Sequence, residues 1–124
     1  MILNENILND FGRLIIKDGY DSGINLVDDL KQITKPPYII KEEASFVKSL
    51  NDEQINGLKK LIKRTQSDLI FTFLKIFEEQ ENYKLIYEEN GKQVNLEEIS
   101  EMLKAEPTIE NGWIDRFSKY SDKK

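Results

Sequence analysis

Apolar residues recur at helical spacing along most of this 124-residue chain. In the first part they repeat every three or four positions, which predicts a helix over residues 4–18. Gly19 is the expected C-terminal stop, because glycine commonly follows the last turn of a helix. A second helix is expected to start at a cap provided by Asp21 or Ser22.

The adjacent Pro36 and Pro37 end the helical pattern and predict an extended segment through residues 38–40. Residues 38–40 therefore form either an edge strand or a plain connection, and the pattern leaves both open. A short amphipathic helix is expected over residues 42–49.

The strongest local signal predicts a long helix over residues 51–81. Asn51 stands at the cap position and Gln54 follows three residues later, as in a capping box. Leu50 and Ile55 occupy the two positions of a hydrophobic staple. The capping residues and the apolar spacing after them therefore predict the same helix.

The second half of the long helix, residues 69–77, is apolar on nearly every side. Such a segment is expected to be covered on most faces, which places the helix at the centre of the fold. The polar residues 65–67 mark a position where the helix could bend or break.

Residues 83–96 have the alternating pattern of a β-hairpin, with Asn90-Gly91 as a type I′ turn. The apolar face of the hairpin is expected to pack against the long helix, because an isolated hairpin is marginally stable. A two-residue turn also fixes the register. The expected pairs are Glu89 with Lys92, Tyr87 with Val94, and Leu85 with Leu96.

Two further helices are expected in the C-terminal part. One starts at Asn95, where Glu98 repeats the capping-box spacing, and ends near Lys104. The other covers residues 108–118, after the break at Pro107. The fold class is therefore α+β and mostly helical.

This architecture has five to six helices around a central long helix over residues 51–81, with one β-hairpin over residues 83–96. Residues 1–124 are expected to form a single globular domain, with a frayed tail at 121–124.

Aromatic side chains at Trp113, Phe117 and Tyr120 form a stripe beside Arg116 and Lys119. Aromatic and arginine side chains are enriched in binding hot spots, so the stripe could be an interface. The only tryptophan of a small domain is more often buried, and we therefore favour a role in the core.

Composition narrows the chemistry, because the chain contains no histidine and no cysteine while 33% of its residues are charged. This excludes an imidazole proton shuttle, a thiol nucleophile and every zinc site built from histidine or cysteine. Carboxylates remain as potential catalysts, but their adjacent pairs diverge in space. The sequence therefore predicts no catalytic residue, no metal and no cofactor, and favours a non-enzymatic function.

Charge is unevenly distributed along the chain. Residues 1–64 are neutral overall, and residues 65–124 carry the whole net charge of −5. This acidity disfavours nucleic acid and anionic membranes and favours a basic protein partner, although it could also serve solubility alone. No apolar run is long enough to span a membrane and no basic segment resembling a signal peptide opens the chain, so a cytoplasmic location is expected.

Four basic residues, Lys59, Lys60, Lys63 and Arg64, cluster on the long helix. They could hold a phosphate or an acidic surface, but a solvated helix face explains them more simply.

The preferred functional hypothesis is a small acidic protein-binding module, most specifically a bacterial inhibitor or immunity-type protein that covers a basic partner. The alternative is a carboxylate-dependent enzyme or small-ligand domain with a pocket between the hairpin and the long helix. Partner identity and oligomeric state stay open. The expected partner-binding residues are Glu78, Glu79, Glu81, Tyr83, Tyr87, Glu88, Glu89, Glu97, Glu98 and Glu101.

Overall fold

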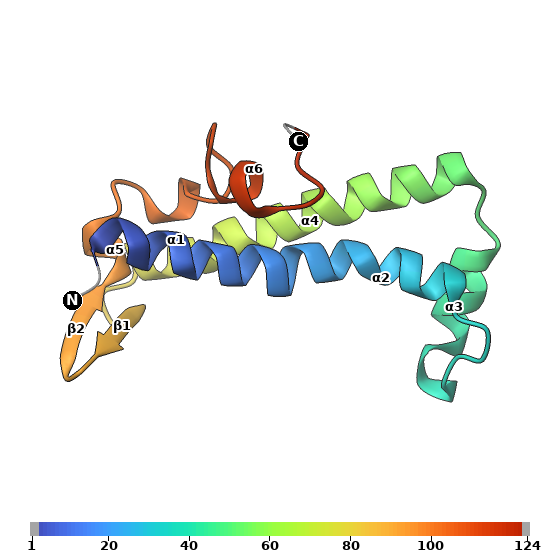
Figure 1. The fold of residues 1–124 in the computed structure, drawn as a ribbon, viewed down its shortest axis with the longest axis horizontal. Coiled ribbons are helices and arrows are strands. Elements are labelled where there is room, and N and C mark those ends of the chain that lie inside the picture. Colours follow the sequence, from blue (N-terminus) through green and yellow to red (C-terminus); the bar gives the residue numbers. More distant parts are fainter. Residues whose placement is uncertain (1–2, 123–124) are drawn as a thin grey trace.

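The protein is elongated in the computed structural model, which describes residues 3–122 (Figure 1). Two long helical segments run antiparallel, and the C-terminal part of the chain packs between them at one end. The fold is α+β and mostly helical, as predicted. The elements are α1 (Asn4–Leu14), α2 (Asp21–Gln32), α3 (Lys41–Lys48), α4 (Asp52–Glu79), β1 (Ile86–Glu89), β2 (Lys92–Asn95), α5 (Leu96–Ile99) and α6 (Trp113–Phe117).

The first long segment is one continuous helix, because the π-helical turns of Ile15–Tyr20 join α1 to α2. The predicted stop at Gly19 is therefore wrong. Ile16, Tyr20 and Ile24 are all buried, with 0%, 4% and 0% of their surface exposed. Continuous packing of this face keeps the backbone helical where glycine alone would permit an end.

The π-helical segment is also where the two long helices approach each other closely. Gln66 of α4 donates a hydrogen bond from its side-chain Nε2 to the backbone oxygen of Tyr20, at 2.9 Å. A Cβ atom at Gly23 would lie 1.7 Å from the Gln66 side-chain oxygen. The glycine thus provides the space for this amide between the helices.

The connection between the two long segments contains no strand. Residues Tyr38–Ile40 form a 3₁₀ turn, which corrects the option of an edge strand, and α3 follows directly. A second, smaller core lies at this end of the molecule, between α2, α3 and the start of α4. Its buried members are Val27, Leu30, Ala44, Val47 and Ile55.

The long helix α4 begins as predicted, with both halves of the capping box formed. The Gln54 backbone N–H donates to the Asn51 side chain at 2.8 Å, and the Asn51 backbone N–H donates to the Gln54 side chain at 2.9 Å. The helix then runs for 28 residues without interruption. The break considered at residues 65–67 is absent.

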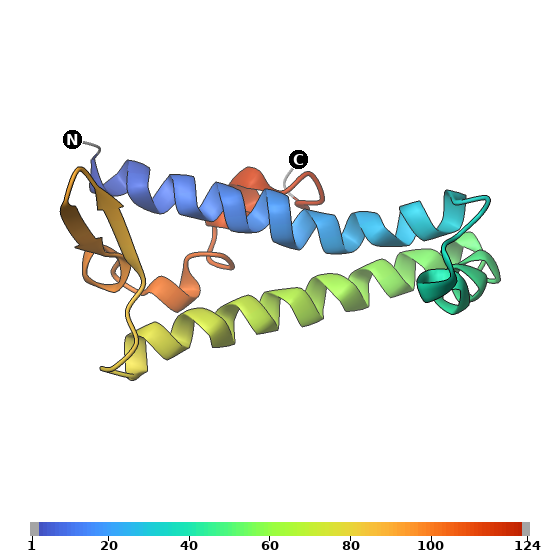
Figure 2. The same ribbon diagram turned by 90° about the horizontal axis from the view of Figure 1, so that it is seen from below.

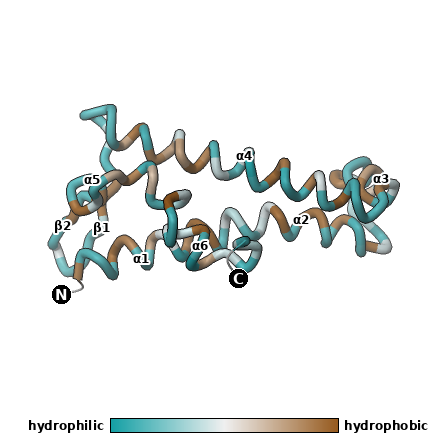
Figure 3. The backbone as a smooth tube through the Cα atoms, turned by 90° about the horizontal axis from the view of Figure 1, so that it is seen from above, coloured by the Kyte–Doolittle hydropathy of each residue, from teal (hydrophilic) through white to brown (hydrophobic). Residues whose placement is uncertain are grey.

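The prediction that the apolar part of α4 is covered on most faces is wrong. Ile70 and Leu74 face the core, with 9% and 0% of their surface exposed. Leu69, Phe73 and Ile76 remain 69%, 45% and 40% exposed. The helix therefore forms one long edge of the molecule, with the other helical segment and the C-terminal part on its inner side (Figure 3).

The β-hairpin has the predicted register. Glu89 pairs with Lys92 and Tyr87 pairs with Val94. Its turn residues have φ values of 52° at Asn90 and 80° at Gly91, the left-handed backbone that a type I′ turn requires. The apolar face packs beside α1 rather than α4: Leu85 and Tyr87 line a cavity with Ile7, Phe11 and Leu14.

The C-terminal helices are shorter than predicted. α5 has four residues and α6 has five, with a 3₁₀ turn at Leu103–Ala105 between them. Asn95 caps α5 by accepting a hydrogen bond from the Glu97 backbone N–H, at 3.1 Å, instead of forming a capping box with Glu98. These short elements lie where the two long helices separate (Figure 2).

Trp113 is the centre of the main core, and the preference for a buried tryptophan is confirmed. Its side chain is 0% exposed and packs edge-on to Phe11, with ring centroids 5.7 Å apart. Its ring faces Gly12, where a Cβ atom would lie 2.5 Å from the indole. The buried members of this core are Ile7, Ile16, Tyr20, Ile24, Ile70, Leu74, Leu96, Leu103 and Trp113.

Two sequence-based expectations concern the membrane and the tail. No helix among residues 3–122 combines the length and the apolar character needed to cross a membrane. The frayed tail does not begin at Ser121, which is only 8% exposed, whereas residues 123–124 lie outside the described part.

We predict opposite effects for alanine at two helical glycines. Gly12→Ala should lower the free energy of unfolding by about 2 kcal/mol, because the new methyl group collides with the rigid Trp113 ring. Gly57→Ala should raise the free energy of unfolding by up to about 1 kcal/mol. No atom outside the neighbouring helix backbone lies within 4 Å of the added Cβ, and alanine favours the helix. Urea unfolding followed by circular dichroism measures both. Equal effects would contradict the close Trp113 packing.

A candidate acidic binding site at the hairpin end

An acidic cavity lies where α4 ends, the hairpin begins and α5 starts. Its volume is about 570 Å³. Four carboxylates and one lysine are among its lining side chains, so its charge is negative. The lining residues are Phe77, Glu78, Gln80, Glu81, Asn82, Tyr83, Lys84, Asn95, Glu97 and Glu98.

Local sequence explains why these segments meet. α4 ends at Glu79, and the Tyr83 backbone N–H closes the following turn by donating to the Gln80 oxygen, at 3.3 Å. After the hairpin, the Leu96 backbone N–H donates to the Leu85 oxygen at 3.0 Å. The buried Leu96 side chain belongs to the main core and lies beside Ile7 and Phe11 of α1, and the residues that follow it in α5 line the same cavity as the end of α4.

One of the four carboxylates, that of Glu78, is held by contacts with another part of the chain. The Glu78 side chain is only 14% exposed and accepts a hydrogen bond from the Lys104 backbone N–H, at 2.6 Å. It also pairs with the Lys104 ammonium at 3.7 Å. Glu78 thus fixes the 3₁₀ turn against α4, and its charge is largely compensated.

The other three carboxylates remain available. Glu81 and Glu98 are exposed, and Glu97 is half-buried. None of them forms an ion pair with another residue within the described range 3–122. No cationic side chain among residues 3–122 therefore neutralises these three carboxylates by a direct ion pair.

The structure divides the ten predicted partner-binding residues into two sets. Five of them line the acidic cavity: Glu78, Glu81, Tyr83, Glu97 and Glu98. The other five do not. Those are Glu79, Tyr87, Glu88, Glu89 and Glu101.

Each of these five is directed elsewhere. Glu79 pairs with Lys75 at 3.6 Å on α4. Glu88 accepts a weak hydrogen bond from Gln93 at 3.4 Å across the hairpin. Glu101 lines a separate cavity next to Leu8. The predicted single acidic face is therefore split.

The two tyrosines considered as anchors also differ. Tyr83 is 62% exposed in the lining of the acidic cavity. The Tyr87 hydroxyl donates a hydrogen bond to Glu89 at 3.0 Å, and this bond raises the pKa of the phenol. Of the two tyrosines, Tyr83 is therefore the one that a ligand in this cavity can contact.

The basic cluster on α4 is mostly committed to contacts within the chain. Lys59 pairs with Asp28 at 2.8 Å, and Lys63 donates to the backbone oxygen of Tyr120 at 2.9 Å. Arg64 pairs with Asp68 at 3.3 Å. The four residues thus do not form one open cationic site.

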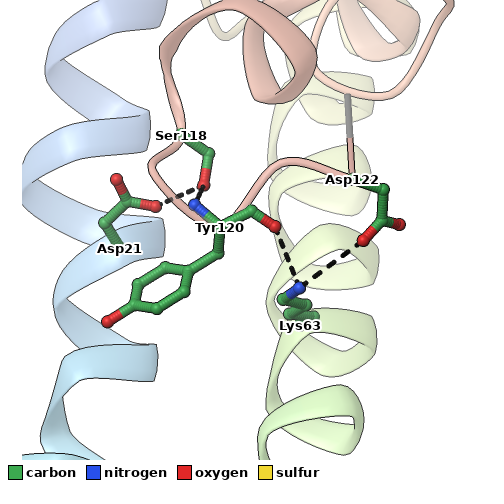
Figure 4. A network of polar contacts seen from close by, with 5 residues as sticks. All are labelled: Asp21, Lys63, Ser118, Tyr120 and Asp122. Carbon is green, nitrogen blue, oxygen red and sulfur yellow. Dashed lines mark hydrogen bonds and ion pairs between the residues drawn. The ribbon is translucent and has the colours of Figure 1, made fainter. Parts of the chain in front are cut away.

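A buried polar network was missed by the sequence reasoning, which treated Asp21 only as a helix cap. Asp21 is 5% exposed and accepts hydrogen bonds from the Ser118 hydroxyl at 2.5 Å and the Lys119 backbone N–H at 3.0 Å. The Tyr120 backbone N–H in turn donates to the Ser118 hydroxyl oxygen at 3.0 Å (Figure 4). No spacing along the chain signals this contact, because the partners lie 97 and 98 residues apart.

The network holds the C-terminal segment on both long helices. The Tyr120 side chain bonds to Asn25, while Lys63 of α4 binds the Tyr120 backbone oxygen and lies 3.9 Å from Asp122. Ser118 is fully buried and its hydroxyl already makes two hydrogen bonds. These residues therefore fasten the chain and offer no free nucleophile.

No constellation for a metal is present in the described part of the chain. Among residues 3–122, no three acidic, histidine or cysteine side chains are grouped so that they could hold a metal ion.

Comparison of the chain with protein-family models, curated proteins and solved structures finds no match.

We predict that Asp21 is the main polar anchor of the C-terminal segment. Asp21→Ala should lower the free energy of unfolding by roughly 3 kcal/mol, because it leaves the buried Ser118 hydroxyl and the Lys119 N–H without an acceptor. The matched control is Asp29→Ala, an exposed aspartate of the same helix, with an effect below about 0.5 kcal/mol. Chemical unfolding measures both, and a similar loss in the two variants would contradict the anchor.

Proposed function

We propose that this protein is a non-enzymatic binding module whose acidic cavity accepts a basic segment of a partner protein. The observation that carries the proposal is the convergence of Glu81, Glu97 and Glu98 from two separate segments on one cavity. They are uncompensated by ion pairs within residues 3–122. A cavity of this charge favours lysine or arginine side chains.

The negative charge of the cavity and the exposed Tyr83 ring both support a cationic ligand. A negative cleft attracts cationic partners over a distance of about 8–10 Å at moderate salt and accelerates their association. The exposed Tyr83 ring adds a surface on which a guanidinium or ammonium group can stack. Lys84 is the one cation among the described lining residues, and the four carboxylates around it outnumber it, so anionic ligands are disfavoured.

More specifically, we propose that the protein is an inhibitor or immunity-type protein of the bacterial cytoplasm that covers a basic enzyme. The uneven charge supports this form, since the whole net charge of −5 belongs to residues 65–124, which include the cavity. Charge complementarity of this kind selects the partner and speeds the encounter.

A small-ligand site is the second candidate, supported by an apolar cavity between α1 and the hairpin. Its volume is about 190 Å³, and Ile7, Phe11, Leu85 and Leu96 are among its lining residues. Typical ligand pockets measure about 300–1,000 Å³. Because the cavity is smaller than this range and carries no carboxylate, binding of a basic protein segment is the better-supported function.

We predict that neutralising the cavity weakens binding of a basic probe. The triple variant Glu81→Gln, Glu97→Gln, Glu98→Gln should bind a fluorescent arginine-rich peptide about tenfold more weakly, because three attractive charges are lost. Fluorescence anisotropy at about 50 mM salt measures the dissociation constant, and raising the salt should weaken wild-type binding.

The control removes the same amount of charge far from the cavity. Glu42→Gln, Glu43→Gln, Glu53→Gln changes three exposed carboxylates near the α3 end and should alter the affinity less than about twofold. Equal weakening by the two triple variants would show that only net charge matters, and it would contradict a binding site in the cavity.

A further inference from the structure

The outer face of α4 is unusually apolar for a surface that no other element within residues 3–122 covers. Leu69, Phe73 and Ile76 are 69%, 45% and 40% exposed. Their spacing of four and three residues places them along one side of the helix. Ile70 and Leu74 are buried in the core and lie roughly 100° around the helix from this stripe. The exposed apolar side chains thus form a stripe beside the buried face of α4, on the helix that makes up one long edge of the molecule in Figures 2 and 3.

Charged residues border this apolar stripe in a regular order. Arg64 pairs with Asp68 at 3.3 Å, and about two turns after Asp68 the Lys75 side chain pairs with Glu79 at 3.6 Å. All four side chains are between 46% and 79% exposed. The order along the helix is therefore base, acid, base, acid.

From this order we infer that the outer face of α4 binds the same face of a second copy of the chain, in an antiparallel arrangement. The pairs Arg64 with Glu79 and Asp68 with Lys75 are placed symmetrically about the point between Phe71 and Thr72. A two-fold axis at this point brings each base of one copy opposite an acid of the other. An interface of this kind is self-complementary and closes after two copies.

The angular positions of these residues around the helix axis also fit the two-fold symmetry. Residues 64, 68, 75 and 79 lie on one flank of the outer face, and 69, 73 and 76 lie on the other. A two-fold axis perpendicular to both helices places each flank of one copy opposite the same flank of the second copy. The charged flanks then face each other, and Leu69 of one copy lies next to Phe73 of the second copy.

A parallel arrangement does not have this property. It would place Arg64 opposite Arg64 and Asp68 opposite Asp68, and like charges across an interface are repulsive. Thr65 and Thr72, between the two flanks, have short side chains that permit close approach of the helices. Both the charges and the central residues therefore select the antiparallel dimer.

A single engineered cysteine tests the geometry, because the chain contains no cysteine of its own. In the antiparallel dimer, Thr72 lies at the two-fold axis, so Thr72→Cys should give a disulfide-linked dimer under mild oxidation. The matched control is Thr65→Cys on the same exposed face. Its two copies would lie about 20 Å apart along the helix axes, beyond the reach of a disulfide. Non-reducing electrophoresis at millimolar protein measures the cross-linked fraction.

The outcomes separate the possible arrangements. Cross-linking through position 72 and not through position 65 supports the antiparallel dimer. Cross-linking through both positions with equal yield indicates a parallel pair and overturns the inference. Absence of a cross-link through either position also overturns it, and points to a different protein as the occupant of this face.

A second experiment tests the apolar flank without a thiol. Sedimentation velocity of the unaltered chain over the micromolar to millimolar range should show a reversible dimer, and Leu69→Glu should raise its dissociation constant at least about tenfold. Leu26→Glu, at a leucine of α2 that is 51% exposed, is the matched control and should leave dimerisation unchanged. Circular dichroism verifies that both variants fold. A chain that stays monomeric at millimolar concentration, or a dimer insensitive to Leu69→Glu, would overturn the inference.

Discussion

The contact between the Trp113 ring and Gly12 is the constraint on which the shape of the molecule depends. The two long helical segments lie close together at the α3 end and separate towards the hairpin (Figure 2). Trp113 fills part of this space, is fully buried, and approaches the first helix where a glycine leaves room for an aromatic ring. Without a large side chain there, the separated ends would leave a cavity, which is costly in a protein interior.

The C-terminal segment is consequently a structural part of the helical core and not an appendage. Trp113 supplies the apolar contact, and the hydrogen bonds of Asp21 to Ser118 and Lys119 supply the polar one. On the other side, Glu78 holds the turn before α6 against α4. The same set of contacts places α5, and with it two carboxylates of the acidic cavity, at a defined position.

The two proposed interaction surfaces arise from different physical causes. The acidic cavity exists because three segments end or begin at the same place and each contributes polar side chains. The outer face of α4 exists because this helix is apolar on more sides than the rest of the chain can cover. The surfaces involve different residues, so a basic partner and a second copy of the chain can be bound by separate parts of the molecule.

Local chemistry was sufficient to predict several elements. The start of α4 follows from Asn51 and Gln54, and the hairpin turn and register follow from Asn90-Gly91. These features involve residues within a few positions of one another, so the sequence contains their whole physical cause. The concentration of carboxylates near the hairpin was predicted on the same basis, from their proximity along the chain.

Long-range packing decided the remainder. The helix continues through Gly19 because Ile16, Tyr20 and Ile24 are buried against partners far along the chain. Which carboxylates share a cavity was decided by the turns after α4 and before α5, and the role of Asp21 by a segment 97 residues away. By itself, the sequence determined the helical and hairpin elements and the acidic character. Only the tertiary structure determined which side chains meet, because burial and hydrogen bonding between distant segments are not encoded in any local pattern.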